Sequence, residues 1–341
     1  MFRLAPLIAA LPSRPAALEL LGEFVPPARF AEKRFDNYQP RQPSQQLART
    51  RLAALATEMR SRAHAGPIAR LRARWSAGRA GGGVYLDGGF GVGKTHLLAA
   101  FWHAAPFPKA YLSFDELVYF IGLVGVEQAR AAFAGQRLAA VDEWELDDPG
   151  NLKLALAFLR GALADGLRVV VTSNTLPLEL GNGRFNQKDF RAEIEELAGA
   201  FEIVTIEGID YRHRRFEADP GKEYFIDSEI LRRHAFAAGE RALLVSFPAL
   251  LAGLAELHPI RYAGLVDRIG TLFVENVDTI PNLVDAIRWV HFVDTLYDSA
   301  VPFRASGDIS LNTLFPSSFI SGPYAKKLSR CLSRMEEMLG E

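Results

Sequence analysis

The amino-acid sequence predicts an α/β protein with a mostly parallel sheet flanked by helices. The chain has 341 residues, 49% of them hydrophobic, which is enough to bury the cores of two domains. From residue 81 onward, short apolar segments alternate with segments of helical periodicity, as in strand–helix–strand crossover units. The expected strands are VYL at 84, AYLSF at 110, RLAAVDE at 137, RVVVTSN at 168 and FEIVTIEG at 201.

Changes of pattern along the chain predict three parts. Residues 1–80 are expected to be an extended N-terminal segment followed by a helix, because NYQPRQPSQQ contains prolines and LARTRLAALATEMRSRAHA has helical spacing. Residues 81–215 are the expected α/β core. Residues 216–341 alternate less regularly, with strand-like ALLVSF and GTLFVENV and the helical NLVDAIRWVHFVDTLYD. We expect this last part to be a lid or a partner-binding region.

Composition narrows the classes of partner and compartment. Lys plus Arg (39) nearly balance Asp plus Glu (40), and the net charge of −1 argues against a nucleic-acid partner. A single cysteine, Cys331, excludes an intrachain disulfide and suits a reducing compartment. The N-terminal MFRLAPLIAALPSRP resembles a signal peptide only superficially, because Pro6 interrupts its apolar run. No other apolar run reaches the roughly 18 residues of a membrane helix, so we expect a cytoplasmic protein without a membrane span.

The segment VYLDGGFGVGKTHLL, residues 84–98, predicts a phosphate-binding loop. Gly88, Gly93, Lys94 and Thr95 match the pattern G-x-x-x-x-G-K-S/T, with an apolar strand before the loop and a helix after it. Glycines permit backbone angles at which successive N–H groups turn inward around a phosphate. The candidate nucleotide-binding residues are Gly88, Gly89, Phe90, Gly91, Val92, Gly93, Lys94, Thr95 and His96. Of these, His96 is expected to pack or cap rather than to catalyse.

A second, acidic segment completes the expected triphosphate site. Lys94 is expected to meet the β- and γ-phosphates, and the Thr95 hydroxyl to bind Mg²⁺. In RLAAVDEWELDD, Asp142 ends a strand and can hold Mg²⁺ through water, while Glu143 can polarise the attacking water. Asn174, at the end of the next strand, is a candidate catalytic sensor of the γ-phosphate, with an ordinary loop asparagine as the alternative. Together these residues predict a site for ATP and Mg²⁺.

The order of the motifs points to a family. GGFGVGKT, AYLSF, AAVDE and VVVTSN stand in the order of AAA+ ATPases. The chain resembles more closely the ZapE cell-division ATPase family, bacterial relatives of the mitochondrial lactation-elevated ATPases. RFDNYQPRQPSQQLA is similar to that family's entry segment, VDEWELDD to its Asp-Glu-Phe-x-Val-x-Asp signature, and TSNTLPLEL to its sensor segment. The resemblance implies a P-loop NTPase fold and an ATPase that acts on a protein partner, which in the bacterial family is FtsZ.

The resemblance also bears on an arginine that acts across subunits. After its sensor segment the family carries an Arg-Phe-x-Pro run, in which one arginine is a candidate finger for a neighbouring subunit's γ-phosphate. Here GRFNQKDFRAEIEEL has Asp189 where that arginine is expected, which leaves Arg184 and Arg191 as candidate catalytic residues. A finger supplied in trans makes activity depend on assembly, so a homo-oligomer is an expected state.

The combined expectation is Mg²⁺-dependent ATP hydrolysis coupled to action on a protein partner. Two other hypotheses stay open. A nucleotide-gated adaptor would bind ATP and hydrolyse little, which the missing arginine favours and Glu143 disfavours. A nucleic-acid-linked ATPase, such as a helicase loader, is kept open by the basic stretch of residues 49–79, although the near-neutral net charge argues against it.

Overall fold

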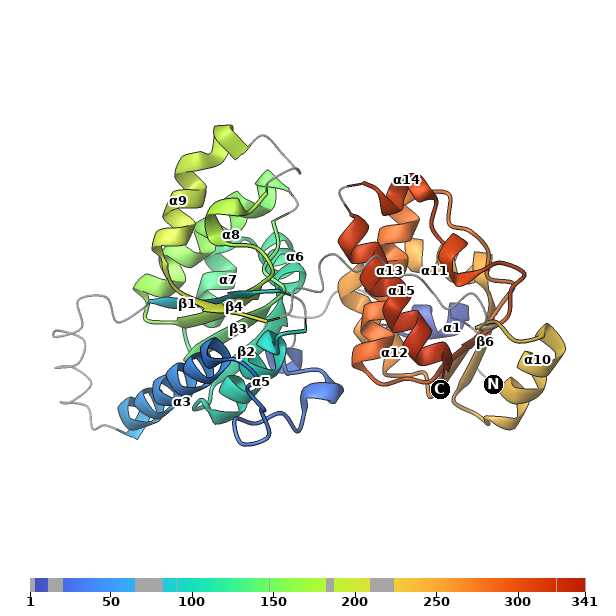
Figure 1. Cartoon of the computed structure of the whole chain (residues 1–341), viewed down its shortest axis with the longest axis horizontal. Helices are drawn as coiled ribbons and strands as arrows, with labels where there is room; N and C mark the ends of the chain where they lie inside the picture. The colour runs from blue at the N-terminus through green and yellow to red at the C-terminus, as the bar shows by residue number, and fades with distance from the viewer. Residues whose placement is uncertain are drawn as a thin grey trace. The chain divides into compact units, whose positions relative to one another are not determined.

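Two compact units make up the chain. The computed structural model describes residues 4–11, 21–64, 82–89, 91–146, 148–181, 187–208, 224–322 and 324–340 (Figure 1). The core unit comprises residues 15–26 and 30–212, and the C-terminal unit comprises residues 1–14, 27–29 and 213–341. Residues before 80 belong partly to each unit, because helix α3 (Pro43–His64) packs in the core unit and helix α1 (Leu4–Ala9) in the C-terminal unit. The three-part division drawn from the sequence stays a prediction.

A five-stranded parallel sheet organises the core unit. Its strands are β1 (Gly83–Gly88), β2 (Lys109–Ser113), β3 (Leu138–Asp142), β4 (Arg168–Ser173) and β5 (Phe201–Ile206). They pair in the order β2-β3-β4-β1-β5, all parallel. The five strands predicted from the sequence are confirmed, and so is the fold class. Because the strands are parallel, their carboxyl ends meet at one edge of the sheet, where ligands bind in such folds.

Helices cover both faces of this sheet, which is why its strands are apolar runs in the sequence. Helices α3 and α5 (Lys94–Ala104) lie on one face (Figure 1). The other face is covered by α6 (Phe114–Val124), α7 (Val126–Phe133), α8 (Pro149–Ala164) and α9 (Arg191–Gly199). Successive residues of β1 serve opposite faces: Leu86 packs with the α3–α5 side and Tyr85 with the other, both fully buried.

Capping residues fix where two helices begin at the polar edge of the sheet. The Ser113 side chain, at the end of β2, accepts the N–H of Glu116, and the Glu116 carboxylate accepts the N–H of Ser113 in return. The Asp148 carboxylate accepts the first N–H groups of α8, which begins at Pro149. The chain direction after β2 and after the acidic segment is therefore set by local sequence.

The C-terminal unit has its own parallel sheet and its own core. Strands β6 (Ala242–Ser246), β7 (Thr271–Glu275) and β8 (Phe303–Ala305) pair in sequence order. Besides α1, its helices are α10 (Ser228–Ala237), α11 (Phe247–Ala255), α12 (Tyr262–Val266), α13 (Leu283–Asp298), α14 (Ser317–Ile320) and α15 (Ala325–Gly340). The predicted ALLVSF and GTLFVENV strands and the predicted α13 helix are confirmed. Strand β8 was missed, because a three-residue strand carries no readable alternation.

Short 3₁₀ helices join these elements. They are η1 (Ala28–Phe30), η2 (Pro177–Glu179), η3 (Gln187–Phe190), η5 (Pro259–Arg261) and η6 (Leu311–Thr313). Among the residues that the structure describes, no helix is both long enough and apolar enough to cross a lipid bilayer.

Candidate nucleotide site

The glycine loop joins β1 to α5 and has two glycines in left-handed backbone conformations. Gly91 and Gly93 have φ of 74° and 91°, in the left-handed region that side chains rarely adopt. Gly93 is also the N-cap of α5, and a Cβ there would lie 2.6 Å from the Tyr38 ring. Helix α5 therefore begins directly at the loop, and the N–H groups of its first turn, which have no acceptor within the helix, lie beside the loop. Phe90, also expected at this site, lies outside the described residues.

Lys94 is buried inside this loop. Its side chain is only 8% exposed, and its ammonium group donates to Gly88 O at 2.8 Å and to Gly89 O at 2.7 Å. A third bond runs to Asn174 Oδ1 at 2.8 Å, just beyond the end of β4. The lysine thus lies between the loop and the neighbouring strand β4.

Asp142, the last residue of β3, accepts hydrogen bonds from three hydroxyl groups. Thr172 of β4 donates to Oδ1, and Thr95 of α5 donates to the same atom at 3.3 Å. Tyr111 of β2 donates to Oδ2 at 3.1 Å. An ionised carboxylate is an acceptor at both oxygens, which suits this arrangement. Three elements thereby fix the orientation of Asp142.

The donor set around Asp142 fits Mg²⁺. Thr95 Oγ1 and Asp142 Oδ1 are oxygen atoms 3.3 Å apart, and Mg²⁺ prefers hard oxygen ligands. Within the described ranges, His, Cys, Asp and Glu side chains do not gather in groups of three that could hold a metal ion. A magnesium ion held here would therefore take its remaining ligands from water and phosphate, as is usual at nucleotide sites.

Glu143 sits on a backbone turn that Thr172 holds in place. Its φ is 53°, an uncommon value for a residue with a side chain and one that costs on the order of 1 kcal/mol. The Glu143 N–H donates to Thr172 Oγ1 at 3.1 Å, and the Trp144 N–H donates to Thr172 O at 2.7 Å. Strained backbone of this kind collects at functional sites, where surrounding contacts maintain it.

Asn174 links Lys94 to a residue with no role predicted from the sequence. While its Oδ1 accepts from Lys94, its Nδ2 donates to Glu145 Oε1 at 3.0 Å. The structure therefore brings together Lys94, Thr95, Asp142 and Asn174, as the sequence analysis expected. Glu145 joins them through its contact with Asn174.

N-terminal residues form one wall of the site. Tyr38 donates to Val92 O at 3.0 Å, and Gln45 contacts the same oxygen at 3.4 Å. His96 packs edge-on against the Tyr38 ring, with centroids 5.1 Å apart, and its Nε2 lies 2.9 Å from Asn37 Oδ1. Burial lowers the pKa of His96, which favours the neutral ring. The motif NYQPRQPSQQ contains Tyr38 and Gln45, but nothing in its spacing shows that it folds back onto the loop.

Of the two candidate trans-acting arginines, Arg184 and Arg191, only Arg191 lies within the described residues. Arg191 is the first residue of α9, has an 81% exposed side chain and pairs with Glu195 at 2.7 Å on the same helix. Asp189 lies in η3, immediately before it. Arg191 is thus a surface residue with a local partner.

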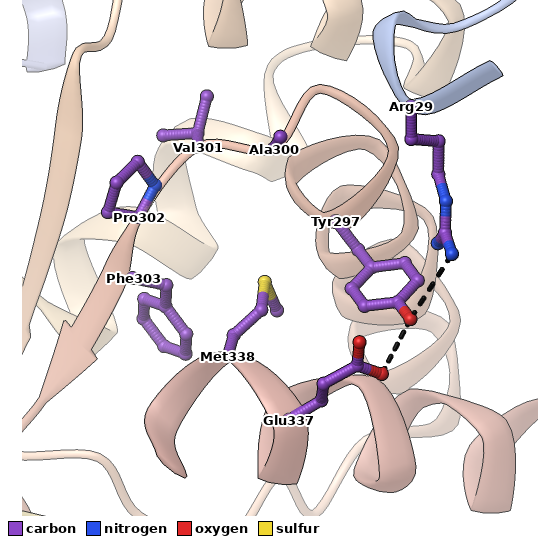
Figure 2. Close-up of a pocket in the computed structure, with 8 residues that line it drawn as sticks. All are labelled: Arg29, Tyr297, Ala300, Val301, Pro302, Phe303, Glu337 and Met338. Atoms are coloured by element: carbon purple, nitrogen blue, oxygen red, sulfur yellow. Dashed lines mark hydrogen bonds between the residues drawn. The ribbon is translucent and has the colours of Figure 1, made fainter. Parts of the chain in front are cut away.

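A cavity of about 250 Å³ lies in the C-terminal unit (Figure 2). Its lining residues are Arg29, Tyr297, Ala300, Val301, Pro302, Phe303, Glu337 and Met338. The Arg29 guanidinium lies 4.0 Å from the centroid of the Tyr297 ring, and the Tyr297 hydroxyl donates to Glu337 Oε2 at 2.6 Å. These polar groups pair with one another and the remaining lining is apolar. The residues suited to phosphate chemistry are those of the core unit.

Comparisons with known proteins found a curated relative and similar solved structures. *Escherichia coli* (strain K12) has a relative, the cell division protein ZapE, that is 23% identical over 303 residues, which cover 76% of this chain and 78% of ZapE. The solved structure of DnaI is similar at 18% identity, with a TM-score of 0.40, over 55% of this chain and 97% of DnaI. AMPPCP-bound DnaA from *Aquifex aeolicus* is similar at 14% identity, with a TM-score of 0.37, over 61% of this chain and 55% of DnaA.

A family model matches both units of the chain. The model of the AFG1-like ATPases matches residues 24–228 and 217–341, which is most of the chain. This match and the relative ZapE confirm the resemblance to the ZapE ATPases inferred from the motifs. The chain belongs to the AFG1-like ATPase family and is an ATPase.

Proposed function

We propose that this ATPase binds ATP with Mg²⁺ at the carboxyl edge of the core sheet and couples hydrolysis to action on a protein partner in the cytoplasm. The carrying observation is a pair of side-chain contacts: Lys94 to Asn174 at 2.8 Å and Thr95 to Asp142 at 3.3 Å. These two contacts join the start of α5, directly after the glycine loop, to the ends of β3 and β4. A triphosphate site needs a cation, a hydroxyl, a carboxylate and a polar sensor side chain close together, and these contacts bring such groups together.

Phosphate binding exchanges the hydrogen-bond acceptors of Lys94. Two of its present acceptors are the neutral carbonyl oxygens of Gly88 and Gly89. Charged phosphate oxygens form stronger bonds with an ammonium group than neutral carbonyls do. The β- and γ-phosphates therefore draw Lys94 away from the loop carbonyls, while the loop N–H groups bind the phosphate. Lys94 moves a short distance from one set of oxygens to another.

Thr95 and Asp142 are the residues that would hold Mg²⁺. When bound, the ion neutralises charge on the β- and γ-phosphate oxygens. Asp142 is oriented for this by Thr172 and Tyr111, so its carboxylate needs little reorganisation. Binding and orientation are thus supplied by residues of four different elements.

Glu143 is proposed to orient and polarise the attacking water. The left-handed turn at Glu143, pinned by Thr172, directs the chain away from β3 immediately after Asp142. Asn174 is proposed to donate to the γ-phosphate and help to place the water. A positioned general base of this kind contributes about 10²- to 10⁴-fold to the rate.

For the partner, we propose a division protein, with FtsZ the first to test. The support is the motif resemblance to the ZapE family and the name of the *E. coli* relative, a cell division protein. We also propose a homo-oligomer in which Arg184 or Arg191 of one subunit reaches the γ-phosphate of the next. The exposed position of Arg191 leaves its side chain accessible to a neighbouring subunit.

A nucleotide-gated adaptor is the second candidate, and Asp189 in place of the family's arginine favours it. An adaptor without a trans finger would hydrolyse ATP at a negligible rate that a Glu143→Gln change leaves unaltered. The helicase-loader hypothesis rests on the basic stretch of residues 49–79, of which residues 65–79 lie outside the described residues. In helix α3, two of its basic residues are engaged in ion pairs, Arg51 with Glu202 at 2.6 Å and Arg62 with Glu58 at 2.6 Å.

The test is steady-state ATP hydrolysis against protein concentration, alone and with polymerising FtsZ, with Lys94→Ala as background. Specific activity that rises with concentration and with FtsZ, and vanishes in the variant, supports the proposal. A low rate that stays flat with concentration and with FtsZ rules out the shared site and the FtsZ coupling, and favours the adaptor.

A further inference from the structure

We propose that Glu145 is a positioning residue that sets the orientation of the Asn174 amide toward the γ-phosphate, an inference that rests on the proposed ATP site. Glu145 lies two residues after Glu143, in the segment that leaves β3. Its Oε1 accepts a hydrogen bond from Asn174 Nδ2 at 3.0 Å. No sequence motif assigns Glu145 a role. From the sequence alone it looks like one of the acidic residues that are common on solvated surfaces near strand ends.

The two ends of the Asn174 amide have partners of opposite charge. Its oxygen accepts from the Lys94 ammonium at 2.8 Å, and its nitrogen donates to the Glu145 carboxylate at 3.0 Å. Turning the amide by half a turn would place its oxygen against the carboxylate and its NH₂ group against the ammonium, two repulsive pairs. Asn174 is only 8% exposed, so water cannot readily replace either partner. Lys94 and Glu145 therefore select the same amide orientation.

The selected orientation gives a sensor the donor that it needs. The amide NH₂ group has two N–H bonds, and the contact with Glu145 uses one of them. The second N–H bond is the type of donor that a γ-phosphate oxygen accepts, whereas the amide oxygen would repel that phosphate. Once phosphate oxygens compete for Lys94, its hold on the amide oxygen weakens. Glu145 then becomes the main group that keeps the nitrogen side of Asn174 in place, so its effect is largest with triphosphate bound.

The backbone under Glu145 is anchored independently of its carboxylate. Its neighbours Trp144 and Leu146 are 0% and 1% exposed. The Trp144 N–H donates to Thr172 O at 2.7 Å, which ties this segment to β4, the strand that leads to Asn174. The buried neighbours and this backbone bond hold the segment in place when the Glu145 side chain is replaced, and the double-mutant cycle below isolates the amide contact from the other interactions of Glu145.

The first test is a double-mutant cycle in the full-length protein, with Glu145→Ala, Asn174→Ala and the combined variant. We expect Glu145→Ala to lower kcat about tenfold and to raise KM for ATP about 3- to 10-fold, because the contact acts on the γ-phosphate both in the bound and in the reacting state. The combined variant should hydrolyse ATP at the rate of Asn174→Ala alone. Glu145→Gln, whose amide oxygen still accepts a hydrogen bond, should recover part of the loss. Glu127→Ala, which removes an 85% exposed carboxylate, is the matched control and should behave as wild type.

Equilibrium binding of ADP and of a non-hydrolysable ATP analogue gives a readout independent of turnover. Glu145→Ala should lower the preference for the triphosphate about 3- to 10-fold and leave ADP affinity unchanged. Equal losses for both nucleotides, or effects on kcat that multiply in the combined variant, would overturn the role of Glu145. So would a Glu145→Ala variant that matches an active wild type. Wild-type protein that binds neither nucleotide would overturn the ATP site itself, and this inference with it.

Discussion

Both units have a helix that follows a parallel strand, yet among the described residues only those of the core unit form a candidate phosphate site. In the core unit, residues 89–93 separate the end of β1 from the start of α5. In the C-terminal unit, β6 ends at Ser246 and α11 begins at Phe247 without an intervening loop. Phe247 is 2% exposed and packs against Trp289, with ring centroids 5.0 Å apart. A buried aromatic ring fills the junction where the core unit has a glycine cradle.

This difference shows that parallel strands followed by helices bring strand ends together at one edge of a sheet, but that the residues at that edge decide whether it can bind a ligand. Polar residues also lie at the C-terminal sheet's edge, but they contact each other: Ser306 Oγ accepts from Ser228 Oγ at 3.0 Å and from Asn276 N at 3.2 Å. In the core unit, Gly93 lets the Tyr38 ring pack closely against the helix terminus, and Lys94 places a cation beside it. The core unit therefore has a charged group at this junction, whereas the C-terminal unit has a packed aromatic ring.

The largest expected effect would show whether the two units are separable. Asp294 is held between Arg330 at 2.8 Å and Arg334 at 2.5 Å. We expect Asp294→Asn to lower the free energy of unfolding of the C-terminal unit by about 2 to 3 kcal/mol, because two arginines lose a counter-charge that is only partly accessible to water. Urea unfolding followed by tryptophan fluorescence measures this, and ATP-analogue affinity should remain unchanged. Lost nucleotide affinity would show that the two units are not energetically separate.

The pH dependence of the same residue has a definite sign. Burial raises the pKa of Asp294, but the charges of Arg330 and Arg334 outweigh burial and hold the pKa below its ordinary value. A lowered folded-state pKa contributes stability that is present above the unfolded value of about 3.9 and is lost as pH falls through the folded value. The wild-type C-terminal unit should therefore lose this contribution below about pH 4, and Asp294→Asn should not.

The next effect lies in the core unit alone. Glu143→Gln should lower kcat about 100-fold and leave the affinity for ATP within threefold, because the amide cannot take up a proton from water. Single-turnover hydrolysis and equilibrium binding measure the two quantities. Thermal unfolding of the C-terminal unit should be unaffected. Unchanged turnover from an already measurable wild-type rate would remove Glu143 from the chemistry.

The smallest expected effect concerns the hydrogen bonds that orient Asp142, the proposed Mg²⁺ ligand. Tyr111→Phe removes the hydroxyl that donates to Asp142 Oδ2 at 3.1 Å while keeping the ring. We expect the Mg²⁺ concentration for half-maximal ATP hydrolysis to rise roughly tenfold, since partners of metal ligands typically contribute this much. ADP binding measured without Mg²⁺ is the control and should not change. A Mg²⁺ dependence identical to wild type would show that Thr95 and Thr172 suffice to orient Asp142.

The sequence by itself determined the five core strands, and it also predicted the candidate phosphate loop, the acidic strand end and the candidate sensor position. Each of these is local: glycines, a lysine and a threonine at fixed spacing describe one strand–loop–helix junction, and apolar runs describe buried strands. Lys94, Thr95, Asp142 and Asn174 could therefore be chosen before any fold was known. Their meeting at one edge follows from the parallel direction of the strands.

Only the tertiary structure decided which other side chains support these four. Thr172 and Tyr111 contact Asp142 because β4 and β2 flank β3 in the sheet, an order that comes from non-local pairing. Tyr38 reaches the loop across 54 residues of sequence, and Glu145 meets Asn174 across 29. In the sequence, Tyr38 and Tyr111 resemble core tyrosines, Thr172 resembles an ordinary strand threonine and Glu145 resembles a surface acid. Their roles depend on distances between strands and segments that no local spacing encodes.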